Sequence, residues 1–182
     1  ATRLGYDLAM AELEIRAARQ ADLDRMIAID HASKSAYAYK MEVLDGKDNF
    51  SRSFQRIHLP RAVTLSYPRD EEALLASWDE ADAIFVGCVL DEVIAYVALE
   101  LRRFRATARV SDLVVAQGLR RKGIGSRMLL AGEAWAHDRG AFRILTELQI
   151  RNDPAIKMML KLGYQLCGYV DQYFPNQEMA LF

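Results

Sequence analysis

The first half of the chain predicts a short strand, a helix and a pair of strands. Polar and apolar positions alternate over residues 14–18, as in a strand, and apolar positions recur at helical spacing over 22–29. Residues 84–90 and 93–101 are rich in β-branched and aromatic side chains on the two sides of an acidic dipeptide. Strand-forming runs that flank a short polar break predict a β-hairpin. Between these segments, residues 31–82 show no clear period and receive no assignment.

In the second half of the chain, strands and helices follow one another directly. The expected elements are a strand over 110–115, a helix over 123–138, a strand over 142–150, a helix over 153–162 and final strands over 164–173 and 178–182. Gly140 and Gly163 follow the two helices, and glycine favours helix C-termini. This order predicts an α/β fold with a mainly antiparallel sheet. One strand-helix-strand connection joins the strand over 110–115 to the strand that follows the first helix.

Length and composition describe one ordinary domain. The chain has 182 residues, 52% of them hydrophobic, with 24 basic and 25 acidic side chains. No repeat, low-complexity tract or linker divides it, so we expect a single domain over 1–182. Its longest apolar run, 83–90, is far shorter than the roughly 20 residues that cross a bilayer. We expect no membrane segment and no secretory signal.

The two cysteines give little reason to expect a disulfide or a metal site. Cys88 and Cys167 lie far apart in the sequence, and neither has a Cys or His partner at metal-ligand spacing. We therefore expect a cytoplasmic protein without a bound metal.

A net charge close to zero hides two halves of opposite sign. Residues 1–100 hold 11 basic and 18 acidic side chains, whereas residues 101–182 hold 13 and 7. Eight of the basic side chains lie between Arg102 and Arg127, where Asp112 is the only acid. Such a segment favours an anion, and a solvated basic face is the alternative interpretation.

A turn with three consecutive cations joins the strand over 110–115 to the next helix. It reads Ala116-Gln117-Gly118-Leu119-Arg120-Arg121-Lys122-Gly123-Ile124-Gly125-Ser126. Amides in the first turn of a helix have no partner within the helix and favour a phosphate. The P-loop pattern fails because Ile124 stands where its lysine belongs, and the dinucleotide pattern fails because Met128 occupies the third glycine position. The pattern R-x-x-G-x-G fits through Arg120, Gly123 and Gly125, and a pyrophosphate is the anion we expect there.

With this pattern the sequence resembles the GNAT superfamily of acyl-CoA-dependent N-acyltransferases. An apolar strand precedes the turn, an amphipathic helix follows it, and a further strand covers 143–150. Asn152-x-x-Ala155, followed by Gly163-Tyr164, is similar to the family's N-x-x-A and G-[FY] element. The resemblance implies an α/β (α+β) fold with a mixed, mainly antiparallel sheet of six or seven strands and about four helices. It also implies a coenzyme-binding core over 83–182, with residues 1–13 as an N-terminal extension.

The resemblance further implies which residues hold acetyl-CoA, the cosubstrate. The strand before the turn would pair its backbone with pantetheine, the turn would hold the pyrophosphate, and the start of the last helix would border the sulfur end. The residues so implied are Leu113, Val114, Val115, Arg120, Arg121, Lys122, Gly123, Ile124, Gly125, Ser126, Asn152 and Ala155. The side chains of the three strand residues would also pack in the core, and Asn152 would also cap the last helix. Both structural roles are compatible with coenzyme binding.

The implied reaction is direct attack of a primary amine on the thioester of acetyl-CoA. An ammonium group must lose a proton before it attacks, so the reaction needs a base. Asp112, directly before the strand segment that would bind pantetheine, is our first choice for this base. Glu147 is the second choice, and Glu100 on the hairpin is a further carboxylate. A strand carboxylate that faces solvent without any catalytic role is the alternative for each.

The leaving thiolate is stabilised by gaining a proton, which makes a catalytic acid useful. Many family members carry a tyrosine four residues after the alanine of the N-x-x-A element, but this chain has Met159 there. We predict Tyr173 as the replacement, with Tyr169, Tyr164 or water as alternatives.

The acceptor is expected to be a primary amine of a small molecule or of a protein N-terminus. Residues 145–149, Asn152 and residues 163–168 resemble the matching stretch of streptothricin acetyltransferases. Residues 15–29 resemble instead the opening of ribosomal-protein alanine acetyltransferases.

Two other functions stay open beside the acetyltransferase. The first is a regulatory domain that binds CoA without catalysing a reaction. Methionine at position 159, in place of the family's usual tyrosine, favours this function. An RNA-binding module would use the basic segment, but the sequence has no aromatic residue between Arg105 and Arg127 for base stacking. We therefore expect an enzyme, as a monomer or a homodimer, with no nucleic acid or membrane partner.

Overall fold

The computed structural model describes residues 13–182, and these belong to two compact units. The first unit consists of residues 13–31 and Arg69–Glu147, and the second of Ala32–Pro68 and Leu148–Phe182. The expected N-terminal extension, residues 1–13, lies outside the described residues except for Leu13, which is buried. The single domain over 1–182 stays a prediction.

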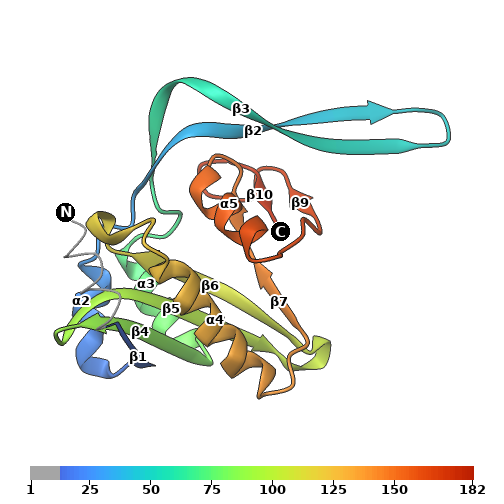
Figure 1. Cartoon of the computed structure of the whole chain (residues 1–182). Coiled ribbons are helices and arrows are strands. Elements are labelled where there is room, and N and C mark those ends of the chain that lie inside the picture. The colour runs from blue at the N-terminus through green and yellow to red at the C-terminus, as the bar shows by residue number, and fades with distance from the viewer. Residues whose placement is uncertain (1–12) are drawn as a thin grey trace. The chain divides into compact units, whose positions relative to one another are not determined.

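The first unit is built on a five-stranded sheet (Figure 1). In sheet order its strands are β1 (Glu14–Ala17), β4 (Ala83–Val89), β5 (Glu92–Arg102), β6 (Thr107–Val115) and β7 (Arg143–Thr146). The β1–β4, β4–β5 and β5–β6 pairs are antiparallel, and the β6–β7 pair is parallel. The predicted hairpin and the predicted strand-helix-strand connection are confirmed.

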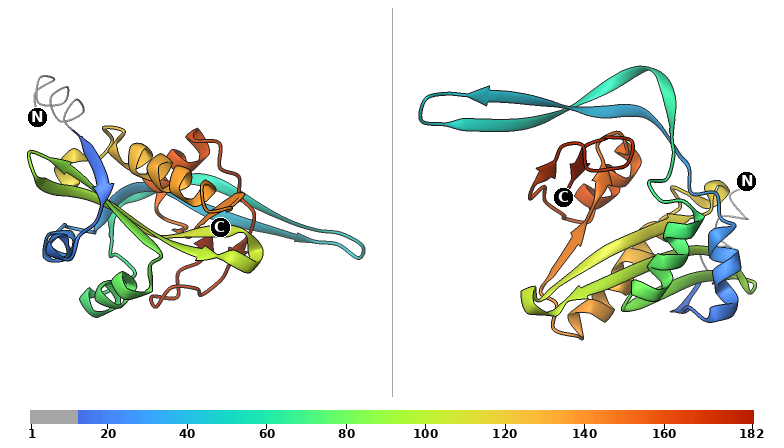
Figure 2. Two further views of the ribbon diagram at one scale, coloured as in Figure 1. Left: turned by 90° about the horizontal axis from the view of Figure 1, so that it is seen from below. Right: turned by 180° about the vertical axis from the view of Figure 1, so that it is seen from behind.

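Helices cover both faces of this sheet. The helix α4 (Ile124–His137) lies on one face, and α2 (Leu23–Ile27) and α3 (Glu71–Glu80) lie on the other (Figure 2). Three short 3-10 helices join these elements: η1 (Gln20–Asp22), η2 (Arg103–Arg105) and η3 (Gln117–Leu119). Because both faces are covered, residues 93–99 of β5 are all buried and form a continuous apolar run. Within residues 13–182, no helix is long and apolar enough to cross a membrane.

The helix α4 approaches the sheet closely at a glycine. A Cβ atom at Gly132 would lie 3.1 Å from each of the two terminal methyl carbons of Leu99 in β5. Leu99 is fully buried beneath the helix, so its side chain has little room to move. The small residue at this position therefore sets the distance between helix and sheet.

The second unit combines a long β-ribbon with the C-terminal part of the chain. The ribbon consists of β2 (Ser33–Asp45) and β3 (Phe50–Leu65), and its tip extends away from the rest of this unit (Figure 1). The C-terminal part contains α5 (Asp153–Lys161) and a small sheet of β8 (Leu148–Gln149), β10 (Ala180–Leu181) and β9 (Tyr169–Val170). Arg56 of the ribbon forms a two-point ion pair with Asp153 at the start of α5, with N–O distances of 2.5 and 3.0 Å.

The predicted fold class is confirmed, but the strands are divided differently from the expectation. The described strands form three sheets, with five strands in the first unit's sheet, three in the small C-terminal sheet and two in the ribbon. The strand expected over 142–150 is interrupted at Glu147, between β7 and β8. The strand expected over 164–173 is wrong except for β9. Residues 164–168 form no strand, and Gln172 has a positive φ of 51°, which is unusual in a strand.

The unassigned segment 31–82 contains the ribbon and α3. Side chains on both sides of the ribbon are partly exposed, so no single buried face produces a clear alternation in the sequence. In α3 no side chain is fully buried, which leaves the helical period weak for the same reason.

Replacement of Gly132 by valine is expected to lower the free energy of unfolding by about 1–3 kcal/mol, the usual cost of overpacking a core. Ala134→Val is the matched control, because it places the same β-branched residue on the exposed side of α4. Urea denaturation of both variants measures the difference. An equal loss of stability in the two variants would contradict the close contact between α4 and Leu99.

Candidate active site

The strand β6 loses its neighbour β7 halfway along its length. The β6–β7 pairing runs from Thr107–Arg143 to Val110–Thr146 and ends there, while the pairing with β5 continues to Val115. A register shift leaves Ser111 between two paired positions, and its Oγ is buried without a hydrogen-bond partner among the described residues. A strand edge of this kind offers N–H and C=O groups to a further extended chain. The predicted pantetheine-binding residues lie along this edge.

The turn after β6 presents the N-terminus of α4. Arg121 and Gly123 have positive φ values of 62° and 82°. The hydrogen bond from Arg127 N to Gly123 O, 3.1 Å long, closes the first turn of the helix. The amides of residues 124–126 precede this bond and are therefore not used inside the helix. Together with the positive end of the helix dipole, they make this turn suited to an anion.

Arg120 fixes this turn to two other parts of the first unit. Its Nε donates to the carbonyl oxygen of Val115 at 2.7 Å, and its Nη2 donates to the carbonyl oxygen of Asp30 at 2.6 Å. Burial lowers the pKa of the Arg120 guanidinium below its ordinary value. The side chain therefore holds the end of β6 and the loop after α2 against the turn. Arg121, by contrast, is exposed.

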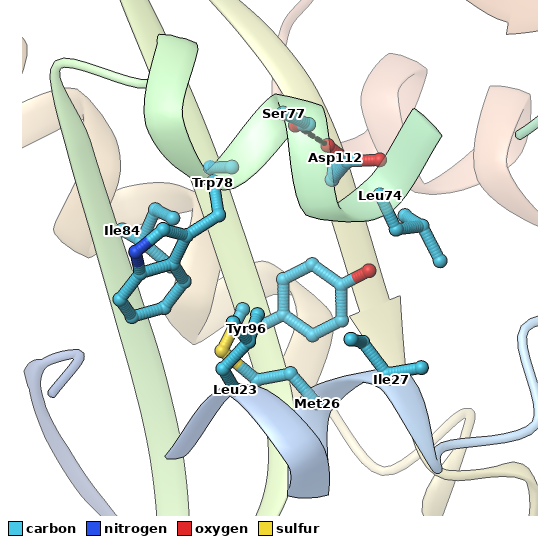
Figure 3. A pocket seen from close by; sticks show the side chains of 10 residues that line it. Leu23, Met26, Ile27, Leu74, Ser77, Trp78, Ile84, Tyr96 and Asp112 are labelled. Carbon is cyan, nitrogen blue, oxygen red and sulfur yellow. Dashed lines mark hydrogen bonds between the residues drawn. The ribbon is translucent and has the colours of Figure 1, made fainter. Parts of the chain in front are cut away.

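A small pocket lies on the other face of the sheet, between α2, α3 and the central strands (Figure 3). It is lined by Leu23, Met26, Ile27, Leu74, Ser77, Trp78, Ile84, Tyr96, Ala98 and Asp112. Its volume is about 10 Å³, which is close to the space that one water molecule needs. Its chemical interest therefore lies in its polar side chains and not in its size.

Asp112 enters this pocket from β6 and is 3% exposed. Its carboxylate accepts a hydrogen bond from Ser77 Oγ at 2.9 Å (Figure 3). It also forms an ion pair with Arg69. Ser77 belongs to α3, and Arg69 lies just before that helix. A buried carboxylate needs such partners to remain charged. Asp112 thus has a structural role in holding α3, and its role as the base stays a prediction.

Tyr96 and His31 form a second polar contact on the same face. Tyr96 Oη and His31 Nε2 lie 2.7 Å apart, and the two rings meet edge to face. Burial, together with the negative charge of Asp112, raises the pKa of Tyr96 far above its ordinary value. Burial also lowers the pKa of His31. Near neutral pH the pair therefore consists of a neutral phenol and a neutral imidazole.

Glu147, the second predicted base, belongs to an ion-pair network at the end of β7. Arg109 of β6 binds both of its carboxylate oxygens, with N–O distances of 2.6 and 3.0 Å. The same guanidinium contacts Glu100 of β5 at 3.1 Å. Two carboxylates therefore share one arginine across three strands. The catalytic role of Glu147 stays a prediction as well.

The remaining predicted site residues belong to the second unit. Asn152 caps α5, because its Oδ1 accepts a hydrogen bond from Ala155 N at 3.3 Å. Met159 is 5% exposed and packs inside the unit. Tyr173 is partly exposed, and its ring lies edge to face against Phe174 and Phe182.

Sequence reasoning missed Ser77 and Tyr96, which line the pocket, and also Arg69 and His31, which contact pocket residues. They come from separate elements, so no local motif connects them. The apolar spacing of Leu74, Leu75 and Trp78 behind Asp70 could have indicated α3, because Asp70 caps that helix by accepting from Ala73 N. Nothing in the sequence indicated that Tyr96 and His31 meet.

The comparison with known proteins agrees with this geometry. Residues 50–164 match the model of the acetyltransferase (GNAT) family, which is more than half of the chain. The chain therefore belongs to the acetyltransferase (GNAT) family and is an acetyltransferase. The predicted family, fold class and enzyme class are confirmed.

Relatives within the family include enzymes that are named for antibiotics. A streptothricin acetyltransferase of Streptomyces lavendulae is 25% identical over 162 residues, which cover 85% of this chain and 82% of that protein. The solved structure of a nourseothricin acetyltransferase is 21% identical with a TM-score of 0.78, over 93% of this chain and 95% of that chain. A putative streptothricin acetyltransferase from Bacillus anthracis str. Ames, in complex with acetyl coenzyme A, is 21% identical with a TM-score of 0.75, over 93% and 96%.

Replacement of Asp112 by asparagine is expected to lower the free energy of unfolding by about 1–3 kcal/mol, because Arg69 loses its charged partner in a buried place. Asp45→Asn is the matched control, since Asp45 forms an exposed ion pair with Arg52 on the ribbon. Exposed pairs contribute at most about 1 kcal/mol. Thermal and urea denaturation measure both variants. A smaller loss for Asp112→Asn than for the control would contradict the structural role of the buried pair.

Proposed function

We propose that this protein transfers the acetyl group of acetyl-CoA to a primary amine of a small molecule. The turn between β6 and α4 is the observation that carries the proposal. It combines positive φ at Arg121 and Gly123, helix amides that precede the first intrahelical bond, and consecutive cations. An amine at the N-terminus of a protein is the other acceptor that the sequence leaves open.

The turn is proposed to hold the pyrophosphate. The backbone amides of residues 121–126 would donate to its oxygens, and Arg121 and Lys122 would add positive charge. Arg120 has a different part in this proposal, because its guanidinium donates to two backbone carbonyls. It would keep the turn in the shape that the phosphates need.

The open edge of β6 is proposed to bind pantetheine through main-chain hydrogen bonds of Leu113, Val114 and Val115. The β6–β7 pairing ends at Val110, and Ser111 Oγ has no hydrogen-bond partner among residues 13–182. Both observations support this fit, since they leave polar groups for a bound chain. Asn152 and Ala155 stay predicted neighbours of the sulfur end. Bound acetyl-CoA supplies the thioester that an amine attacks.

Charge favours a cationic acceptor. The first half of the chain, which includes α3 and β5, carries an excess of acidic side chains. An ammonium group is drawn toward such a surface, which raises the encounter rate. The streptothricin acetyltransferase relative supports an amine-bearing antibiotic as the first acceptor to test. Tyr173 stays the predicted acid for the leaving thiolate.

The proposed function is tested by mass spectrometry of the purified protein with acetyl-CoA and a panel of amines. The panel should contain streptothricin, polyamines and peptides with free N-termini. We expect one acceptor to gain a single acetyl group while CoA is released. Coenzyme binding without any acetylated product would favour the regulatory, non-catalytic alternative.

Replacement of Gly125 by valine is expected to weaken acetyl-CoA binding at least tenfold, because a branched side chain in the first turn of α4 would block the approach of phosphate to the amides. Gly118→Ala is the matched control in the same turn, since a Cβ there meets nothing within 4 Å. Isothermal calorimetry measures both affinities, and circular dichroism checks the fold. Unchanged affinity in folded Gly125→Val would mean that the phosphates bind elsewhere.

A further inference from the structure

The contact between His31 and Tyr96 has no part in coenzyme binding as proposed above. His31 lies in the loop after α2, and Tyr96 is buried in the middle of β5. The 2.7 Å distance between Nε2 and Oη is that of a short hydrogen bond between side chains. Tyr96 lines the small pocket and His31 is partly buried, and a titratable pair beside a pocket is a candidate for proton transfer.

Hydrogen bonds on both sides of the His31 ring assign its tautomer. The backbone of Ile29 also bonds the ring and raises the pKa of His31, as a carbonyl that accepts a ring N–H does. Because Nε2 faces Tyr96, we assign this N–H to Nδ1. The neutral imidazole then carries its lone pair on Nε2, and the hydroxyl of Tyr96 donates to it.

The charged groups around His31 have opposing effects on its protonation. Asp30 beside it and Asp112 of β6 both favour the imidazolium, whereas Arg120 disfavours it. Burial is the largest effect and lowers the pKa of His31. The ring is therefore neutral near pH 7 and able to accept a proton, and two carboxylates stabilise the charge that appears when it does.

The pair also lies beside the strand that would bind the coenzyme. Tyr96 is paired with Val114, which belongs to the part of β6 that continues beyond the last β7 contact. On the other side, Arg120 bonds both the carbonyl of Asp30 and the carbonyl of Val115. The residue before His31 and the end of β6 are therefore held by one guanidinium.

We propose that His31 is the proton acceptor for the attacking amine and that the hydroxyl of Tyr96 relays the proton to it. This inference rests on the proposed acetyl transfer. An N–H bond of the ammonium breaks and its proton goes to Tyr96 Oη, while the original Tyr96 proton goes to His31 Nε2. The amine keeps the electron pair with which it attacks the thioester, and the tyrosine is a neutral phenol before and after the step.

The relay is compatible with the structural role of Asp112, the carboxylate that lines the pocket. Asp112 is held by Arg69 and Ser77, and in the relay it acts at a distance by stabilising imidazolium on His31. The high pKa of Tyr96 agrees with a group that passes a proton on and does not store negative charge.

The test compares His31→Gln and Tyr96→Phe with the wild type, using acetyl-CoA and the amine acetylated by the wild type. His137→Gln, at the exposed end of α4, is the control histidine. We expect kcat near pH 7 to fall about a hundred- to ten-thousandfold in His31→Gln and at least tenfold in Tyr96→Phe, as for loss of a general base or its relay. The affinity for acetyl-CoA, measured by calorimetry, should stay within about twofold in both.

The pH dependence of kcat separates the relay from a structural role. In the wild type kcat should rise with pH through the pKa of His31, below about 6.5, and then level off. In His31→Gln this limb should be absent, and kcat should keep rising at alkaline pH. In Asp112→Asn the limb should remain and move to lower pH, because the carboxylate that favours the imidazolium is gone. Loss of the limb in Asp112→Asn with its retention in His31→Gln would assign the base to Asp112 and overturn the relay.

The remaining outcomes also decide between the proposals. If His31→Gln does not fold, Tyr96→Phe carries the test, because it removes only the hydroxyl and keeps the ring. A folded Tyr96→Phe with wild-type kcat and pH profile would overturn the relay and leave the acetyl transfer intact. A wild-type protein that binds acetyl-CoA but acetylates no amine would overturn the proposed function, and the relay with it.

Discussion

The early end of the β6–β7 pairing is the constraint on which the first unit's chemistry depends. A parallel pair needs a crossover helix, so β6, the turn and α4 must follow one another in that order. Because the pairing stops at Val110, the rest of β6 keeps an open edge beside the N-terminus of α4. The interruption in the sheet thus leaves an open main-chain edge that ends at a turn whose helix amides are not used inside the helix.

Polar groups in the interior of this unit are compensated in pairs. Asp112 has Arg69 and Ser77, Glu147 has Arg109, and the Tyr96 hydroxyl has His31. Removal of a partner from a buried group such as Asp112 or Tyr96 leaves that group less well compensated, which usually costs more than the intact interaction contributes. The face of the sheet beneath α2 and α3 is therefore arranged by specific partners as much as by apolar packing.

The sequence predicted those elements in which the spacing of apolar residues matches the face that is buried in the structure. The β4–β5 hairpin and α4 have sharp boundaries because their apolar positions face a core, and the glycine turn has a spacing that competing motifs do not fit. The ribbon of β2 and β3 escaped prediction because neither of its faces is consistently buried. The Tyr96–His31 contact could not be predicted, since it joins residues 65 positions apart without any shared pattern.

The two hydrogen bonds of Arg120 connect the loop after α2 to the end of β6. A single guanidinium holds the carbonyl of Asp30 and the carbonyl of Val115, so the loop that carries His31 and the strand end before the turn are not independent. Any ligand that stabilises one of these two arrangements changes the equilibrium of the other, and thermodynamic linkage makes the effect reciprocal. If one ligand binds beside the loop and another beside the strand end, this guanidinium couples the two binding events, and each changes the affinity for the other by the same factor.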